Sequence, residues 1–157
     1  MATPLEINQL FREYGFTLGS VESLTGGLFA KEITAVPGAS HFYKGGLVTY
    51  ATEEKNRLLG ISFEDIDKYG VVSKEIAALM ESNAQRLLNV DICVSFTGNA
   101  GPEAMEGKPV GEVHIGIASH DGVQVFSHQL AGNRAEIQQK CVELALQRLK
   151  IKIFEKK

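Results

Sequence analysis

Cysteine is scarce in this chain, and the sequence patterns that hold metal ions or disulfides are missing. Only two cysteines, Cys93 and Cys141, occur among 157 residues, and no CxxC, HxxxH or HExxH string is present. A structural or catalytic zinc site therefore has little support. We expect both cysteines to be buried free thiols in a reducing compartment.

Long apolar runs and an excess of positive charge are also missing. No run approaches the ~20 apolar residues that a membrane-spanning helix needs, and the N-terminus lacks the basic and apolar regions of a signal peptide. The formal net charge is −3, whereas a nucleic-acid-binding domain usually has a basic face. We therefore expect a cytoplasmic protein that binds neither a membrane nor nucleic acid. This charge does not exclude a small phosphate-bearing ligand, which needs only one or two well-placed cations and some backbone amides.

Length and hydrophobic periodicity predict one compact α/β domain over 1–157. Apolar spacing and turn residues predict helices over 4–14, 27–36, 53–59 and 63–69, a longer helix capped by Ser73 and a final helix that opens at Asn133. Strands are expected over 16–21, 42–51, 91–97, 110–119 and 123–130. Gly45-Gly46 indicates a bulge or a close backbone approach, and Thr52 can cap the helix that follows. Because helices and strands alternate before a late hairpin, the sheet should be mixed and mainly parallel.

Three loops follow strands at the edge where open α/β sheets bind ligands, namely 22–27, 50–55 and 97–101. In the first loop, Ser23 stands in the stretch Glu22-Ser23-Leu24-Thr25-Gly26-Gly27, between a strand and a helix. The two glycines let the backbone turn sharply, and the amides at the following helix start can hold an anion or an oxyanion. Ser23 could therefore be a nucleophile, a phosphate ligand or only a helix cap.

A serine hydroxyl needs a base before it can act as a nucleophile at neutral pH. No histidine stands near a glycine-rich turn with a nearby carboxylate, so we expect surface or partly buried positions for His41, His114, His120 and His128. Lys55 is the other candidate base, because a helix start and burial both lower the pKa of an amine. The alternative is a solvated lysine paired with Glu53 or Glu54.

Two further segments could contact a ligand. The segment Thr97-Gly98-Asn99-Ala100-Gly101-Pro102 follows the most regular strand, and its hydroxyl and amides could bind polar groups or form an ordinary turn. Arg134 follows the expected cap Asn133, where a guanidinium beside free backbone amides can clamp a phosphate. The alternative for Arg134 is a solvent-exposed side chain without a ligand.

Several short motifs occur in order along nearly the whole chain, from about Leu5 to about Leu149. Besides the Ser23 stretch and the segment 97–102, they are Pro37-Gly38-Ala39-Ser40, Gly46-Leu47-Val48-Thr49-Tyr50, Glu54-Lys55, Leu59-Gly60, Gly70-Val71-Val72-Ser73 and Lys108-Pro109-Val110-Gly111. Together they resemble the CinA C-terminal domain family, also known as the nicotinamide-nucleotide amidases or NMN deamidases. The resemblance implies a three-layer α/β/α sandwich with a mixed, mainly parallel sheet.

The resemblance also implies an activity and the residues that perform it. Active members hydrolyse the carboxamide of nicotinamide mononucleotide to nicotinic acid mononucleotide and ammonia, without a metal ion or other cofactor. Matching motif positions make Ser23 the nucleophile and Lys55 the base, with Tyr50 in the proton relay or stacked on the pyridine ring. Substrate contacts are then expected at Thr25, Gly26, Gly27, Thr97, Gly98 and Arg134. A pyridine nucleotide is the expected small-molecule partner, and a homodimer is the expected assembly.

The chain departs from the family pattern at Leu24, where cysteine is usual, at Asn99, where an apolar residue is common, and in the loop 101–107. That loop is shorter and more acidic than usual, with Glu103-Ala104-Met105-Glu106-Gly107 in place of a longer Gly-Gly-Ser segment. We expect the stand-alone form of the family, without the N-terminal partner domain of the two-domain members. Two alternatives remain: an amidase for a different small amide, and a non-catalytic nucleotide-binding or interaction module associated with competence or DNA damage.

Overall fold

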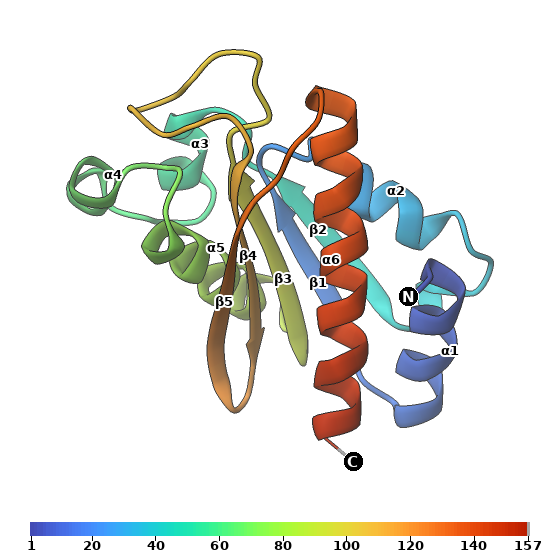
Figure 1. The fold of residues 1–157 in the computed structure, drawn as a ribbon. Coiled ribbons are helices and arrows are strands. Elements are labelled where there is room, and N and C mark those ends of the chain that lie inside the picture. The colour runs from blue at the N-terminus through green and yellow to red at the C-terminus, as the bar shows by residue number, and fades with distance from the viewer. Residues whose placement is uncertain (157) are drawn as a thin grey trace.

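The computed structural model describes residues 1–156, which form a five-stranded sheet with helices on both faces (Figure 1). Its elements, in chain order, are α1 (Pro4–Tyr14), β1 (Leu18–Glu22), α2 (Leu28–Thr34), the 3₁₀ turn η1 (Ala39–His41), β2 (Tyr43–Val48), α3 (Thr52–Arg57), α4 (Phe63–Tyr69), α5 (Lys74–Leu88), β3 (Ile92–Gly98), β4 (Glu112–Ser119), β5 (Gly122–Gln129) and α6 (Arg134–Glu155). Each helix and strand predicted from the sequence is present, with ends that differ by a few residues.

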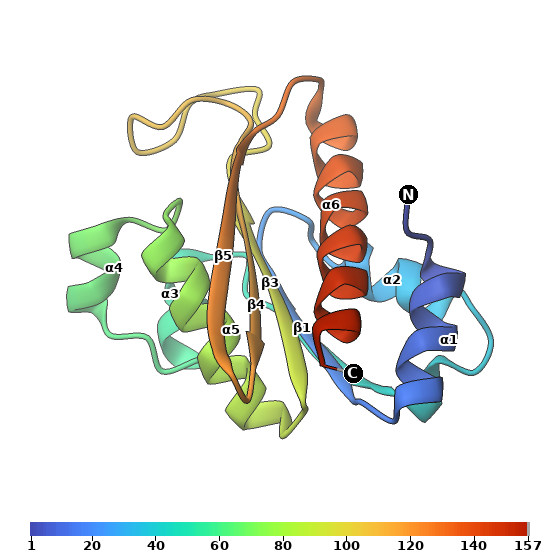
Figure 2. The same ribbon diagram turned by 60° about the horizontal axis from the view of Figure 1, so that its bottom comes forward.

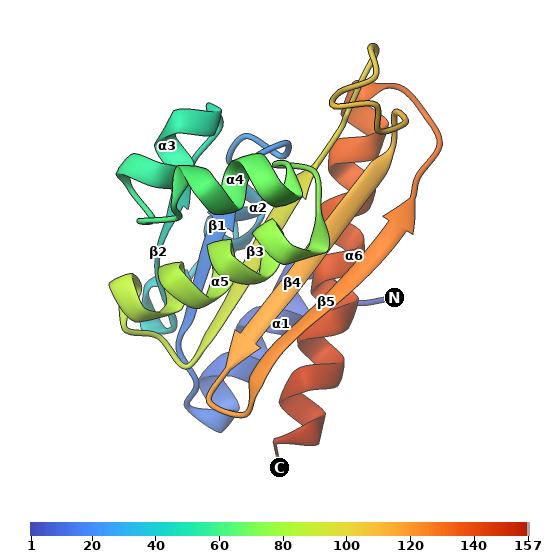
Figure 3. The ribbon, with the colours of Figure 1, turned by 90° about the vertical axis from the view of Figure 1, so that its left-hand side faces the viewer.

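The strands lie in the order β2-β1-β3-β4-β5. Strand β1 pairs in parallel with both β2 and β3, while β4 and β5 extend the sheet in antiparallel fashion on the other side of β3. Helices α1, α2 and α6 cover one face, and α4 and α5 lie across the other (Figure 1 and Figure 3). The predicted α/β fold with three layers and a mixed sheet is confirmed.

Each face of the sheet packs against its own apolar cluster. Along β3 the side chains of Ile92, Val94 and Phe96 belong to the cluster beneath α1, α2 and α6. Cys93 belongs to the cluster beneath α4 and α5. Cys93 and Cys141 are both buried and free, as predicted, and burial raises the pKa of both thiols. This shift disfavours the thiolate that a cysteine nucleophile would need.

The predicted helix starts are correct at two positions and wrong at one. Ser73 and Asn133 cap α5 and α6, and Asn133 forms the expected capping box with Glu136. Thr52, however, is not a cap but the first residue of α3, because the extended backbone of Ala51 places the N-cap one residue earlier. The β1–β2 register shifts between the pairs of Leu18 and Gly19 and skips Lys44, so the bulge lies one residue before the expected Gly45-Gly46. The close backbone approach is present at Gly46, where a Cβ would lie 2.6 Å from Ser20 Oγ.

The last helix, α6, is 22 residues long and spans the length of the sheet. Its inner side carries Ile137, Val142 and Leu149, which are buried in the cluster that it covers. Across the described chain, no helix combines the length and the apolar composition that a membrane crossing requires. The N-terminal end of α6 lies at the end of the sheet where β1 and β3 finish (Figure 1).

Candidate active site

The carboxyl ends of parallel strands β1, β2 and β3 lie at the same end of the sheet, where the three predicted ligand-binding loops follow them. The loop between β3 and β4 arches over this end beside the start of α6 (Figure 2). Residues from four distant parts of the chain therefore meet here. This is the edge at which open α/β sheets bind ligands.

Ser23 is held at the end of β1 by backbone hydrogen bonds. Its N–H donates to the Phe96 carbonyl at 2.9 Å, and its own carbonyl accepts from the Gly26 N–H at 3.0 Å. Gly26 and Gly27 have φ values of 59° and 104°, which favour glycine and turn the chain sharply into α2. The N-cap of α2 is Gly27, without a side-chain cap, so the helix-cap alternative for Ser23 is wrong.

Lys55 reaches Ser23 from α3 and is almost fully enclosed. Its side chain is 1% exposed, and its Nζ lies 3.0 Å from Ser23 Oγ and 2.6 Å from the Thr49 carbonyl oxygen. Burial lowers the pKa of Lys55 to about 8, against the opposite influence of Glu106 and Glu53. The alternative of a solvated, paired lysine is therefore wrong. In its neutral form, a buried amine with a lowered pKa can accept the proton of a serine hydroxyl that it contacts.

Glu22 supports the Ser23 loop, a role that we do not predict from the sequence. Its buried carboxylate accepts from Thr25 Oγ1 at 2.7 Å, from the Phe29 N–H at 2.9 Å and from the Ala30 N–H at 3.1 Å. These bonds tie the Ser23 loop to the first turn of α2. They also turn the Thr25 hydroxyl, expected to face substrate, toward the protein interior. A carboxylate at a strand end just before a glycine-rich helix start is the signal that could have indicated this role.

A pocket of about 120 Å³ opens beside Ser23. Four of the predicted site residues line it, namely Ser23, Tyr50, Gly98 and Arg134, together with Leu24, Asn99, Ala100 and Met105. A larger hollow of about 660 Å³ lies at the opposite end of the sheet, next to α1 and Thr17. We place the site at the smaller pocket because the serine–lysine pair lies there.

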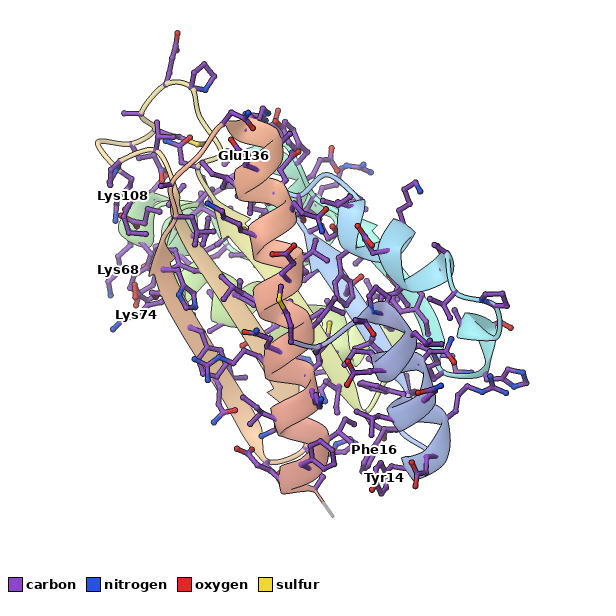
Figure 4. All side chains as sticks on the ribbon, turned by 45° about the vertical axis from the view of Figure 1, so that its right-hand side comes forward. Tyr14, Phe16, Lys68, Lys74, Lys108 and Glu136 are labelled. Atoms are coloured by element: carbon purple, nitrogen blue, oxygen red, sulfur yellow. The ribbon has the colours of Figure 1, made fainter. Side chains whose placement is uncertain are left out.

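Arg134 and Tyr50 meet at the mouth of this pocket. Arg134 is the first residue of α6, and its guanidinium donates to the Tyr50 hydroxyl and to the Gly101 carbonyl. Tyr50 is 57% exposed, so its ring is available to a ligand. Figure 4 shows the end of α6 that carries Glu136 beside the loop between β3 and β4. The expected guanidinium at the helix start is therefore present at the site, and the backbone holds it there.

Thr97 and the histidines lie away from the pocket. Thr97 is buried, and its hydroxyl donates to the Val71 carbonyl at 2.6 Å rather than toward Ser23. His114 contacts Ser127 at 2.7 Å and Glu112 at 3.0 Å on the antiparallel strands, as expected for a partly buried strand position. In residues 1–156, no group of three His, Cys, Asp or Glu side chains is arranged to hold a metal ion.

Comparison with known proteins identifies the family to which the chain is similar. Residues 2–153 match the family model described as the CinA C-terminal domain. A competence-damage inducible protein of Bacillus subtilis (strain 168) is 38% identical over 152 residues, which is 97% of this chain and 36% of that protein. A competence-damage inducible protein of Limosilactobacillus reuteri (strain DSM 20016) is 52% identical over 107 residues, which is 68% of this chain and 26% of that protein. The chain thus spans about a third or less of the length of these curated relatives.

Solved structures of CinA proteins have the same fold as this chain. The CinA superfamily protein KP700603 from Klebsiella pneumoniae superposes with a TM-score of 0.92 at 26% identity, covering 95% of this chain and 94% of that one. The competence/damage inducible protein CihA from Agrobacterium tumefaciens superposes with a TM-score of 0.90 at 32% identity, covering 96% of this chain and 92% of that one. The chain belongs to the CinA C-terminal domain family.

Proposed function

We propose that this chain hydrolyses the carboxamide of nicotinamide mononucleotide, with Ser23 as nucleophile and Lys55 as general base. The observation that carries the proposal is the 3.0 Å contact between Lys55 Nζ and Ser23 Oγ, with the pKa of Lys55 lowered to about 8 by burial. An interaction module has no physical need for a buried amine beside a serine hydroxyl. The family resemblance supplies the substrate.

The proposed reaction proceeds in two halves. Neutral Lys55 accepts the Ser23 proton as Oγ attacks the amide carbon, and the carbonyl oxygen becomes an oxyanion. The N–H of Gly26 already donates to the Ser23 carbonyl, so we place the oxyanion near Gly98, which lines the pocket. The Lys55 ammonium returns the proton to the leaving nitrogen, and ammonia departs. Water, deprotonated by Lys55, then hydrolyses the acyl-enzyme and restores Ser23.

Substrate recognition is assigned to the mouth of the pocket. A volume of about 120 Å³ is below the roughly 300–1,000 Å³ of ordinary ligand sites, so the pocket encloses only the carboxamide end of a nucleotide. The phosphate would then lie toward Arg134 and the start of α6, where a guanidinium and helix amides favour an anion. Arg134 would exchange its bond to Tyr50 for the phosphate. The freed Tyr50 ring would stack on the pyridine.

An ammonia-release assay on purified protein with nicotinamide mononucleotide tests the proposal. Turnover should be abolished in Ser23→Ala and Lys55→Ala, and retained in the matched surface variants Ser40→Ala and Lys44→Ala. Circular dichroism should show that all four variants are folded. If the wild-type protein binds the nucleotide and releases no ammonia over hours, the amidase proposal is wrong and the binding-module alternative is favoured.

A second candidate is an amidase for a different small amide. It is favoured by the shorter acidic loop, which places Met105 in the pocket wall and Glu103 and Glu106 nearby in sequence. Parallel assays with phosphorylated and dephosphorylated nicotinamide ribosides separate the two candidates. A phosphate clamp at Arg134 should make the phosphorylated compound better by about tenfold or more, whereas equal rates favour the different amide.

A further inference from the structure

The loop between β3 and β4 contains a tight hairpin turn at 105–108, with Glu106 at its tip. Met105 and Lys108 exchange two backbone hydrogen bonds, of 3.2 and 2.7 Å. The two residues between them, Glu106 and Gly107, have φ values of 54° and 71°. Positive φ at both central positions is typical of a turn that favours Asn-Gly or Asp-Gly, and glutamate is uncommon there. The Glu106 side chain must therefore make contacts that offset this backbone preference.

Those contacts are with the turn that joins α4 to α5. One carboxylate oxygen of Glu106 accepts from the Val71 N–H at 3.1 Å, and the other accepts from the Val72 N–H at 3.1 Å. Gly70, with a φ of 77°, leaves room for this approach, because a Cβ there would lie only 2.9 Å from Glu106 Oε1. Figure 4 shows Lys108 on the same flank as Lys68 and Lys74, which stand on either side of this turn in the sequence.

The same turn is fixed by two further side-chain hydrogen bonds, one from strand β3 and one from Ser73, the N-cap of α5. Thr97 Oγ1 donates to the Val71 carbonyl at 2.6 Å, and Ser73 Oγ donates to the Gly70 carbonyl at 2.7 Å. The turn at 70–72 is therefore an anchored surface onto which Glu106 fastens the loop tip. Met105, next to Glu106 in the chain, lines the Ser23 pocket.

We propose that Glu106 is a positioning residue of the Ser23–Lys55 site, because its carboxylate holds the 101–107 loop against the turn at 70–72 and so sets the pocket wall at Met105. The kinetic part of this inference rests on the proposed amidase function, whereas the structural part does not.

Glu106 also influences the proposed general base, Lys55. Glu106 and Glu53 are the two charges that raise the pKa of Lys55 against the effect of burial. Loss of the Glu106 charge should therefore lower the pKa of Lys55.

The test compares Glu106→Gln and Glu106→Ala with Glu103→Gln, which removes an equal charge from the same loop. Hydrogen exchange of the Val71 and Val72 amides should accelerate by about tenfold in Glu106→Ala, at one or both of them in Glu106→Gln, which keeps a single acceptor oxygen, and at neither in Glu103→Gln. NMR titration of the Lys55 side chain should give a lower midpoint in Glu106→Gln than in wild type. In the ammonia assay, the rising limb of the pH profile should move to lower pH, and Glu106→Ala should raise KM by about tenfold.

The readouts separate this inference from the proposed function. Unchanged exchange at Val71 and Val72 in Glu106→Gln overturns the positioning role, whether or not ammonia is released. Faster exchange and a lower Lys55 midpoint, with no ammonia from any variant or from wild type, support the positioning role and refute the amidase. Faster exchange combined with an unaltered pH profile and KM in an active enzyme overturns the connection to the site.

Discussion

Replacing Glu81 with glutamine should remove one large contribution to the pH dependence of this protein's stability across the neutral range. Glu81 lies on the inner side of α5 and is 0% exposed. Its Oε2 lies 3.4 Å from Ser95 Oγ, while its Oε1 has no hydrogen-bond partner within the described part of the chain. The carboxyl occupies the space above Gly116, where any Cβ would collide with it. Burial raises its pKa from 4.5 to about 10, and the Ser95 contact opposes this shift only weakly.

The magnitude follows from proton linkage. In the unfolded chain the carboxyl titrates near its ordinary value of 4.5, whereas in the folded protein it keeps its proton up to about 10. Between these values the folded state binds one more proton than the unfolded state, so stability falls as pH rises, by about 1.4 kcal/mol per pH unit. From about pH 5.5 to about pH 8.5 the loss is ~4 kcal/mol, a large part of the ~5–15 kcal/mol that stabilises a typical domain. Glutamine does not titrate and has no such slope.

Urea unfolding at several pH values measures the effect. The difference in unfolding free energy between Glu81→Gln and wild type should change steadily with pH, in favour of the variant at higher pH. A constant offset from the unpaired glutamine amide does not alter this slope. Glu13→Gln, at an exposed carboxylate of α1, is the control and should run parallel to wild type. Parallel curves for Glu81→Gln and wild type would refute the protonated, buried carboxyl.

The remaining predictions concern the site. Ammonia release should increase with pH through about 8, because burial lowers the pKa of Lys55 to about 8 and the neutral amine is the base. Lys55→Arg, which stays protonated, should reduce kcat by about 10²–10⁴-fold in the same assay. Glu22→Gln should cost about 1–3 kcal/mol in urea unfolding, because three donors at the start of α2 face two carboxylate oxygens and the glutamine NH2 that replaces one of these oxygens cannot accept a hydrogen bond. Arg134→Ala should raise KM for the phosphorylated substrate by about tenfold or more and alter KM for the dephosphorylated one by less than about twofold.

Local sequence was sufficient to predict the elements and the end of the sheet where the site lies. Glycine pairs, caps and apolar spacing are local signals, and the carboxyl ends of parallel strands necessarily meet. The burial of Lys55 could not be predicted in this way. Its neighbours Glu53, Glu54 and Asn56 are polar residues typical of a solvent-exposed helix. The amine reaches Ser23, which lies 32 residues earlier in the sequence, only because the folded chain packs α3 against the end of β1.

The prediction that two threonine hydroxyls contact substrate is not supported by their hydrogen bonds, for a related reason. Thr25 and Thr97 stand at strand ends next to glycines, which is where a ligand contact is expected. In the folded chain each hydroxyl instead satisfies a buried acceptor, the Glu22 carboxylate or the Val71 carbonyl. Buried acceptors must be paired, and a nearby threonine can do this without any ligand. A hydroxyl at a strand end therefore indicates a site only when the neighbouring backbone is already paired.

The same pairing rule distinguishes the buried glutamates Glu22 and Glu81. Glu22 receives three donors, from Thr25 and two amides of α2, whereas Glu81 has one contact of 3.4 Å. Because this single contact does not compensate for burial, the Glu81 carboxyl stays neutral. The formal net charge of −3 counts Glu81 as ionised, so its protonation leaves −3 + 1 = −2 for the folded protein near pH 7. Charge counted from composition thus overstates the acidity of this fold, and unfolding should release a proton.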